Sequence, residues 1–290
     1  MNRSTTLESP VGIQGRAASV PGWPAMVWAQ VRLNHAALLR QRGLAFSVLT
    51  LPLFLVVVYT MNPTAHETLG GVPLRAYVGV GTLAMGCLAA FMSVSAAAVY
   101  RREERIYKRL RGTALPVGAI FAGDVAYAVL VGLVQEAFAA GYLIVVLHAP
   151  MPRNIPLILV ASLIGSVAFC VLALGVSGLL PSNEVAQLAS VPVLLIGALG
   201  SGMAIPLSAL PGWARGVCEV LAPTPIVRAV RTGWFGRDFS AEPAKHVAAH
   251  HVGLLNGFQV SGAGLGVALL WIAVGLWLTR RFFRWDPRRA

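Results

Sequence analysis

Long uncharged apolar stretches constrain this chain more than any other feature of its sequence. A helix needs about 20 predominantly apolar residues to cross a hydrocarbon core that is about 30 Å thick. The sequence offers stretches of this kind at six places: 44–61, 76–99, 117–147, 155–180, 185–207 and 252–279. We therefore predict an all-α integral membrane protein with six transmembrane helices.

The composition agrees with a membrane environment. Only 12% of the 290 residues are charged, whereas a soluble domain has about 25%. Lysine and arginine total 23 against 11 acids, which gives a net charge of +12. No basic module interleaved with aromatic residues accompanies this excess, so we expect the lipid bilayer, and no nucleic acid, as a partner.

The distribution of basic residues predicts the orientation. The segments on the side of both termini carry 16 lysines and arginines, and those on the other side carry 7. Basic residues concentrate on the cytoplasmic side of membrane proteins. Both termini are therefore predicted to be cytoplasmic.

Composition also divides the chain into four parts. Residues 1–22 lack periodicity and are predicted to be a flexible tail, whereas residues 23–43 have the pattern of an interfacial helix lying along the membrane surface. Residues 44–280 form the six-helix domain, and residues 281–290 form a basic cytoplasmic tail. The connection 208–251 is predicted to face outward.

Several short motifs do not indicate a ligand or metal site. Residues 79–84 fit the dinucleotide fingerprint GxGxxG/A, and Gly262 and Gly266 form GxxxG. Inside apolar spans, small residues of this kind usually allow close helix packing. Three cysteines without short metal-type spacing predict neither a disulfide framework nor a zinc site.

Neither lysine of the chain stands in a phosphate-binding loop. Such a loop needs Gly-Lys-Ser/Thr, but Tyr107 precedes Lys108 and Ala244 precedes Lys245. We therefore expect no ATP hydrolysis by this chain alone.

Two acids fall inside the predicted spans. Asp124 and Glu136 are 12 positions apart, about 18 Å along a helix, so they cannot share a proton or a metal ion. Asp124 fits a position at the interface near the start of its helix. Glu136, beside Gln135, is a candidate for a polar substrate path, and the alternative is a structural partner elsewhere in the bundle.

A histidine-bearing segment is a possible metal site. Glu242, His246 and His250 would share one face if the segment were helical. An exposed amphipathic face is the commoner explanation, so no metal site is predicted.

The charged segment between the second and third spans carries the most information. It combines basic residues with Glu103 and Glu104 and ends at Gly112 and Pro116. Ile106, Tyr107 and Leu110 would give a short helix an apolar edge. Two acids and an apolar edge exceed what orientation alone requires, so a docking helix is predicted, with a solvated loop as the alternative.

This segment resembles the loop after the second span in permease subunits of ABC-2 type exporters, the group that includes daunorubicin-resistance-type drug efflux permeases. In this family the loop reads like Arg-Glu-Glu-Gly-x-Leu-Lys-Arg-Leu-Arg-x-Thr-Pro-Leu. Residues 102–116 match it, with Arg105 in place of the usual Gly and Ala114 in place of a frequent Pro. The resemblance implies that this segment couples the permease to an ATPase, through these residues: Arg102, Glu103, Glu104, Ile106, Tyr107, Lys108, Leu110 and Arg111.

A second match follows the fifth span. Leu210, Pro211 and Trp213, and then Pro223 and Pro225, are similar to the short outer re-entrant helices of the family. The resemblance implies a non-catalytic half-transporter of a bacterial cell membrane that works as a homodimer or heterodimer. A separate cytoplasmic ATPase would bind ATP and Mg²⁺, and the apolar spans favour an amphipathic or hydrophobic substrate.

Three other classes of membrane protein are alternatives to a permease subunit. A secondary transporter or channel would usually show charge at the bilayer midplane and broken helices in corresponding halves, and only Glu136 and Pro192 hint at these features. A membrane-embedded transferase would need clustered acids for Mg²⁺, and no such cluster lies in or beside a span. A scaffold protein stays open as a third class.

Overall fold

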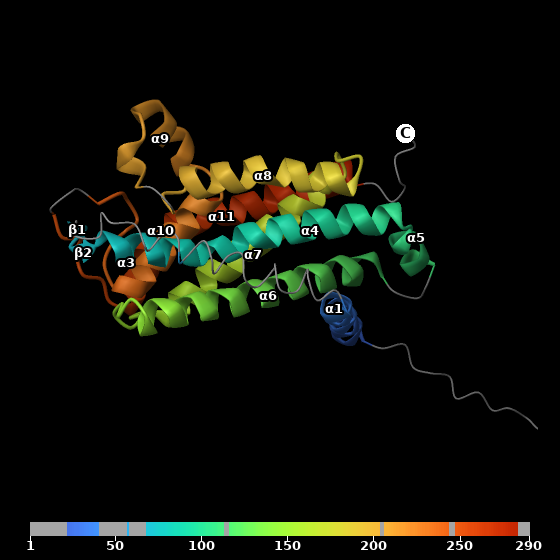
Figure 1. Cartoon of the computed structure of the whole chain (residues 1–290), viewed down its shortest axis with the longest axis horizontal. Helices are drawn as coiled ribbons and strands as arrows, with labels where there is room; N and C mark the ends of the chain where they lie inside the picture. The colour runs from blue at the N-terminus through green and yellow to red at the C-terminus, as the bar shows by residue number, and fades with distance from the viewer. Residues whose placement is uncertain are drawn as a thin grey trace, which may run out of the picture.

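The computed structural model describes residues 22–40, 57, 68–112, 116–203, 206–243 and 247–283. Helices dominate this part of the chain (Figure 1). The longer helices are α1 (Trp23–Arg40), α4 (Met85–Glu103), α6 (Val117–Val145), α7 (Ile155–Ser177), α8 (Asn183–Gly200), α10 (Pro223–Phe235) and α11 (Leu254–Phe282). The shorter elements are the hairpin β1 (Thr68–Leu69) and β2 (Val72–Pro73), α3 (Leu74–Gly81), the 3₁₀ helix η1 (Thr82–Ala84), α5 (Ile106–Arg111), the 3₁₀ helix η2 (Leu207–Ala209) and α9 (Gly212–Glu219).

Five helices within the described residues are long and apolar enough to cross a membrane. They are Leu74–Glu103, Val117–Val145, Ile155–Ser177, Asn183–Gly200 and Leu254–Phe282. These helices match the second to sixth predicted spans. The first predicted span, 44–61, lies outside the described residues except for Val57, as do most of the two terminal tails.

The fifth predicted span ends earlier than expected. We predicted it over 185–207, but α8 stops at Gly200 and the chain turns at Gly202, where φ is +74°. Such a backbone conformation favours glycine because a side chain would be strained there. Of the described apolar residues that follow α8, Met203 therefore lies in the turn and Leu207 in η2.

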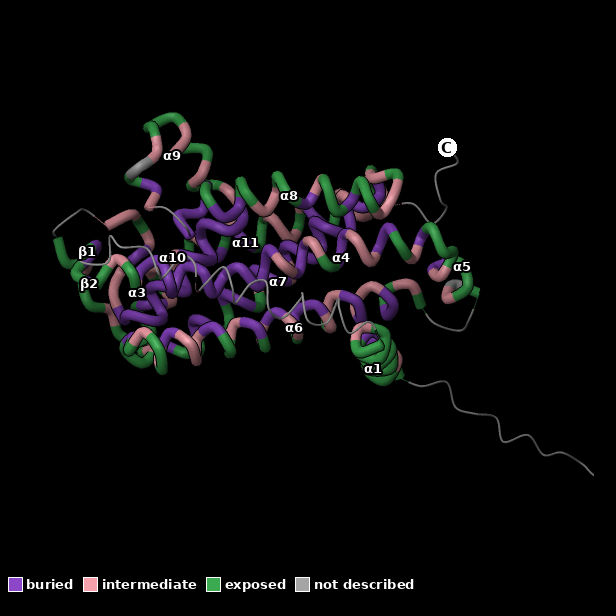
Figure 2. The backbone as a smooth tube through the Cα atoms, viewed as in Figure 1, coloured by how far each residue is buried: buried purple, intermediate pink, exposed green. Residues whose placement is uncertain are grey.

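The spans form an inner and an outer set. In the apolar 18-residue stretch of each span, the buried share is 72% in the continuous span of α3, η1 and α4 and 72% in α7. It is 28% in α6, 28% in α8 and 22% in α11. Figure 2 shows the same division, with buried residues concentrated in α4, α7 and α10. The outer helices keep exposed apolar side chains such as Phe138, Leu188 and Leu270, which a bilayer would cover.

Close packing uses other glycines than the predicted pair. A methyl group on Gly175 of α7 would lie 2.6 Å from Leu278 of α11, and one on Gly86 of α4 would lie 3.1 Å from the Gly132 carbonyl oxygen. No described neighbour lies within 4 Å of such a group on Gly262 or Gly266. Among the described residues, no other helix therefore packs closely on this GxxxG pair, and its close-packing role stays a prediction.

The dinucleotide-like residues 79–84 lie within α3 and η1, inside the second span. The phosphate-binding fingerprint requires a loop between a strand and a helix. Helical backbone here excludes that geometry, as the packing interpretation predicted.

The bundle has two distinct ends (Figure 1). Helices α1 and α5 lie at one end, which we call the α5 end. The hairpin, α3 and α10 lie at the other, the α10 end, and α9 projects from the bundle there. The connection 208–251, which we predicted to face outward, thus contains α10, whose residues are almost all buried.

Candidate functional site

The charged segment at the α5 end consists of two pieces. Helix α4 continues through Arg101 and Arg102 to Glu103, and α5 begins only at Ile106. Between them, Arg105 adopts a left-handed conformation with φ of 53°. This conformation suits glycine, and glycine is what the resembling permeases usually carry at this position.

Arg102 points inward from the end of α4. Its side chain is 2% exposed and donates hydrogen bonds to the carbonyl oxygens of Ser177, at 2.9 Å, and Leu180. The last carbonyls of a helix have no partner within it, and a cation is favourable at that end. Arg102 therefore ties α4 to the C-terminal end of α7.

Tyr107 is the inward-facing residue of α5. It is fully buried, and its hydroxyl group donates a hydrogen bond of 3.2 Å to Asp124. Its ring meets Phe121 and Phe283 edge to face, each with a centroid distance of 5.8 Å. Burial, with a smaller contribution from the Asp124 carboxylate, raises the pKa of Tyr107, so the phenol keeps its proton.

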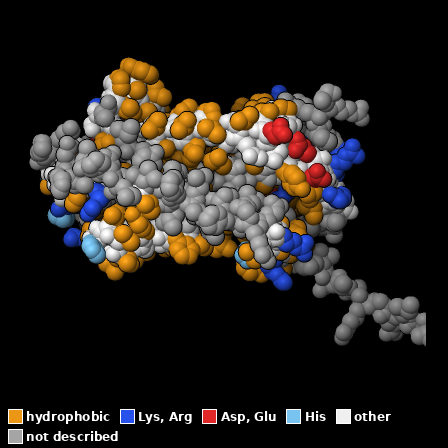
Figure 3. Space-filling view, in the orientation of Figure 1, with side chains coloured by type: hydrophobic (Ala, Val, Ile, Leu, Met, Phe, Trp, Pro, Cys, Tyr) orange, Lys and Arg blue, Asp and Glu red, His pale blue; other side chains and the backbone are white. Residues whose placement is uncertain are grey.

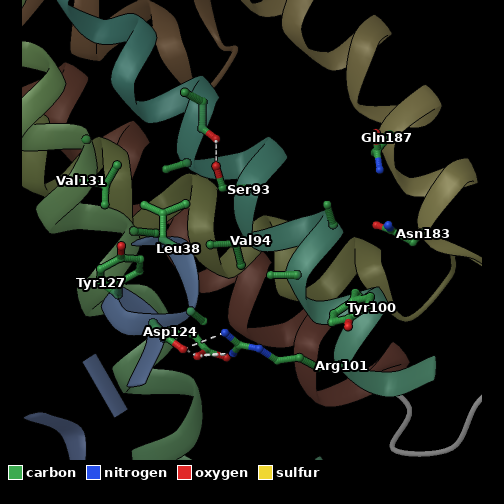
Figure 4. A pocket seen from close by; sticks show the side chains of 18 of the residues that line it. Leu38, Ser93, Val94, Tyr100, Arg101, Asp124, Tyr127, Val131, Asn183 and Gln187 are labelled. Atoms are coloured by element: carbon green, nitrogen blue, oxygen red, sulfur yellow. Dashed lines mark hydrogen bonds and ion pairs between the residues drawn. The ribbon is translucent and has the colours of Figure 1, made fainter. Parts of the chain in front are cut away.

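Asp124 lies at the centre of a polar cluster that joins four helices. It forms an ion pair with Arg101 of α4 and accepts a hydrogen bond of 2.9 Å from the Asn34 amide of α1. Arg101 in turn donates to the Asn34 side-chain oxygen at 2.8 Å. We call Asn34, Arg101, Tyr107 and Asp124 the junction. The ion pair is visible in Figure 4.

The junction adds to what we predicted for Asp124. The residue does lie near the start of α6, as expected, but it is only 7% exposed and has an arginine partner. A buried charge needs such a partner. Sequence reasoning missed the pair, although Arg101 near the end of one helix and Asp124 near the start of the next lie at a similar depth.

The other charged side chains that the structure describes in this segment face outward. Glu103, Glu104, Arg105, Lys108 and Arg109 are exposed, and Ile106 and Leu110 are half-buried. Acidic and basic side chains lie close together on this end of the molecule (Figure 3). We call these five exposed residues the charged face.

Two contacts hold the charged face in place. A Glu103 carboxylate oxygen accepts a hydrogen bond of 3.3 Å from the Asn183 backbone N–H at the start of α8. Arg109 donates to the Glu104 carbonyl oxygen at 3.1 Å. The predicted coupling residues therefore separate into buried anchors, Arg102 and Tyr107, and an exposed surface; the side chain of Arg111 lies outside the described residues.

A cavity of about 550 Å³ adjoins the junction. It lies between α1, α4, α6 and α8, and Figure 4 shows side chains from these helices around it. Alanines and valines make up much of its wall, and the polar lining residues include Asn34, Tyr127, Gln135, Asn183 and Gln187. A mostly apolar wall with a few polar groups is typical of a small-molecule site.

The two substrate-path candidates behave differently. Gln135 is 7% exposed and lines the cavity. Glu136 is not among the lining residues and accepts a hydrogen bond of 2.7 Å from the Ser162 hydroxyl group of α7. The geometry thus favours Gln135 for the path, whereas Glu136 has the structural partner that we named as its alternative.

At the α10 end, the predicted re-entrant residues divide between two helices. Pro211 and Trp213 begin α9, and Trp213 is 79% exposed. Pro223 and Pro225 begin α10 and are buried. Leu210, just before α9, is half-buried.

Arg231 of α10 is a buried charge that sequence reasoning missed. It donates to the carbonyl oxygens of Tyr77, at 3.0 Å, and Gly202, at 2.6 Å. Its guanidinium lies 3.6 Å from the centre of the Tyr77 ring. Gly81 leaves room for it, since a methyl group there would lie 2.3 Å from the arginine. Arg231 thereby joins α3, the turn after α8 and α10.

The histidine-bearing segment does not form the helix that a shared metal-binding face would need. Within its described part, residues 247–250 are not helical, and His251 forms a β-bridge with Arg237. His246 lies outside the described residues. Among the residues that the structure does describe, no cluster of three possible metal ligands occurs.

Comparison with known proteins places the chain in a family. No match was found among curated proteins. The family model of the ABC-2 type transporter, however, matches residues 26–235, which is more than half of the chain. The matched range includes the junction, the charged face and the cavity. The chain therefore belongs to the ABC-2 type transporter family.

Proposed function

We propose that this chain is the membrane-spanning permease subunit of an ATP-driven exporter. Membership of the ABC-2 family supports a permease, and the chain has no phosphate-binding loop of its own. A separate cytoplasmic ATPase would bind ATP and Mg²⁺ and supply the energy. The α5 end would be cytoplasmic, as would both termini, in a bacterial cell membrane.

The observation that carries the proposal is the division of residues 101–111. Arg101, Arg102 and Tyr107 are committed to contacts inside the bundle. The charged face lies immediately outside them. A protein bound there would therefore contact a part of the permease that is anchored to the helices of the bundle. Charge-assisted contacts across such an interface are strong when they are desolvated. We therefore assign ATPase docking to the charged face, and support of that face to the buried anchors.

The cavity supports a substrate that is amphipathic or hydrophobic. Among the described lining residues the only acid is Asp124, which is already paired with Arg101, so this part of the lining carries no uncompensated negative charge. The apolar wall would accept a drug, a natural product or a lipid-like molecule, and Gln135 would contribute a hydrogen-bonding group. We place the efflux path here and, as in daunorubicin-resistance-type permeases, expect two permease subunits to work together.

Reversal of charge on the charged face tests the docking assignment. The Glu103→Lys/Glu104→Lys variant should lose co-purification with the ATPase encoded beside it and lose substrate-stimulated ATP hydrolysis. Loss of charge-assisted interface contacts costs about 2–5 kcal/mol, which weakens binding at least about 30-fold. Thermal unfolding should change little, because both acids are exposed and the hydrogen bond that Glu103 accepts from the Asn183 backbone N–H lies at the surface.

Glu219→Lys is the matched control, because Glu219 is an exposed acid in α9 at the opposite end. It should keep full ATPase binding. If the double variant binds the ATPase as the wild type does, the docking assignment is wrong. If the wild type binds no ATPase at all, a secondary transporter or channel becomes the better explanation.

A further inference from the structure

Helix α1 is basic and carries no acid. Its 18 residues include Arg32, His35 and Arg40, and neither aspartate nor glutamate occurs among them. Within the described part of the chain, neither arginine forms an ion pair. The helix therefore presents an uncompensated positive charge.

The helix lies across the bundle rather than along it. In Figure 1 the spans run horizontally, whereas α1 is seen nearly end-on. It packs on α6 through Gln30, Val31 and Asn34, and Gly123 permits this approach, since a methyl group there would lie 2.4 Å from Gln30. If the spans cross the membrane, α1 is roughly parallel to its surface.

The depth of α1 follows from its contact with Asp124. Asp124 lies seven residues after Val117, the first residue of α6, which is about 10 Å along the helix axis. Interfacial helices lie at the boundary between headgroups and acyl chains, about 5–10 Å deep. If α6 enters the membrane near Val117, the junction thus holds α1 at the boundary between the lipid headgroups and the acyl chains.

The outward side of α1 combines apolar and cationic groups. Trp28, Arg32 and Leu39 follow one another at helical spacing, and Trp28 and Leu39 are 59% and 57% exposed. Leu33 and Arg40, seven positions apart, form a second pair, and Leu33 is 53% exposed. Tryptophan is enriched at membrane interfaces, and the arginine fork matches the geometry of phosphate oxygens.

We propose that α1 is a binding surface for anionic phospholipids of the adjacent leaflet. Arg32 and Arg40 contact the lipid phosphates, while Trp28, Leu33 and Leu39 insert among the first carbons of the acyl chains. The junction couples this surface to α4, α5 and α6, so lipid bound at α1 would stabilise the α5 end. The inference concerns α1 and is independent of whether an ATPase docks on the charged face.

Brominated lipids, which quench tryptophan fluorescence on contact, provide the test. The full chain is placed in nanodiscs of phosphatidylcholine with phosphatidylglycerol as the minority lipid. In one preparation the phosphatidylglycerol carries the bromine. In the other, an equal amount of the phosphatidylcholine is brominated instead. The Trp28→Phe variant, measured in both, isolates the signal of Trp28 from those of the other tryptophans.

The expected result is stronger quenching of Trp28 by brominated phosphatidylglycerol, by about twofold or more, since each arginine near such a surface favours an anionic lipid about fivefold. Arg32→Gln/Arg40→Gln should abolish the difference, and Arg32→Lys/Arg40→Lys should retain most of it. Arg75→Gln, at an exposed arginine of the α10 end, should leave it unchanged.

Equal quenching by the two brominated lipids would overturn the proposal. So would a preference that survives in the double glutamine variant. Absence of quenching by either lipid would show that protein, such as a second copy of the chain, covers α1 instead.

Discussion

Both ends of the bundle hold a buried arginine through backbone carbonyls, Arg102 at the α5 end and Arg231 at the α10 end, but the α5 end adds an arginine that depends on a buried carboxylate. At the α5 end, Arg101 is balanced by the carboxylate of Asp124. At the α10 end, Arg231 is satisfied by two backbone carbonyls and the face of Tyr77. A charge pair can be broken by removing either member, whereas backbone carbonyls stay in place whatever the side chains are. The α5 end should therefore be the more sensitive end to substitution of a partner.

The outer surfaces of the two ends differ as well. The α5 end presents the charged face next to the exposed apolar groups of α1, whereas at the α10 end α9 exposes Trp213 and Val217, and Val220 just after it, with few charges among them. Charged groups suit docking of a soluble protein, and apolar groups suit contact with lipid. This contrast supports the proposed orientation, with the α5 end in the cytoplasm.

Removal of the junction carboxylate should have the largest effect. Asp124→Asn leaves Arg101, whose side chain is only 17% exposed, without its counter-charge, and loss of one partner of a buried pair costs about 3–5 kcal/mol. We expect this loss in the free energy of unfolding, measured in detergent by chemical denaturation. Replacing both partners, as Arg101→Met/Asp124→Leu, should cost much less; an equal cost would mean that the charge pair is not what stabilises this end.

Removal of the other buried arginine should have a smaller effect. Arg231→Met keeps much of the side-chain volume and leaves no unpaired charge, but it removes two hydrogen bonds from a charged donor. The expected cost is about 2 kcal/mol, measured by the same denaturation.

Gly81→Ala should reproduce part of this loss, because the added methyl group would displace Arg231. Gly262→Ala is its control, since it has open space among the described residues. If Arg231→Met proves more harmful than Asp124→Asn, the contrast between the two ends is wrong.

A stabilising substitution is expected to have the smallest effect. Arg105 holds a left-handed conformation that costs a non-glycine residue about 1 kcal/mol. Arg105→Gly should relieve most of this strain and raise the melting temperature slightly. Gly112→Ala is the control. Gly112 has an ordinary φ of −74°, so this substitution does not relieve any left-handed strain. A destabilised Arg105→Gly variant would imply that the Arg105 side chain makes contacts worth more than the strain.

The spans were predictable because apolar length is a local property of the sequence. Their ends were less so. The charges of Arg101 to Glu103 end the apolar stretch, but α4 continues through them because intrahelical hydrogen bonds form regardless of side-chain polarity. The sequence up to Leu207 is apolar enough to predict a longer fifth span. The helix α8 nevertheless ends at Gly200, because the chain turns at Gly202.

The candidate site was predictable in composition and only partly in geometry. The sequence indicated that residues 101–111 combine acids, bases and an apolar edge, and that Asp124 and Glu136 are unusual at their depth. Which of these side chains face inward could not be derived. Arg102 and Tyr107 are buried because α6, α7 and the end of α11 lie against them, and those helices are distant in sequence.

By itself, the sequence determined the membrane as the solvent, the positions of five described spans and the charge asymmetry of the chain, since each depends on composition within a short window. Only the tertiary structure decided that Asp124 pairs with Arg101, that Glu136 pairs with Ser162 and that α10, with its two arginines, lies largely inside the bundle. The physical reason is that a buried polar group must find a partner, and the partner's identity depends on which helices become neighbours.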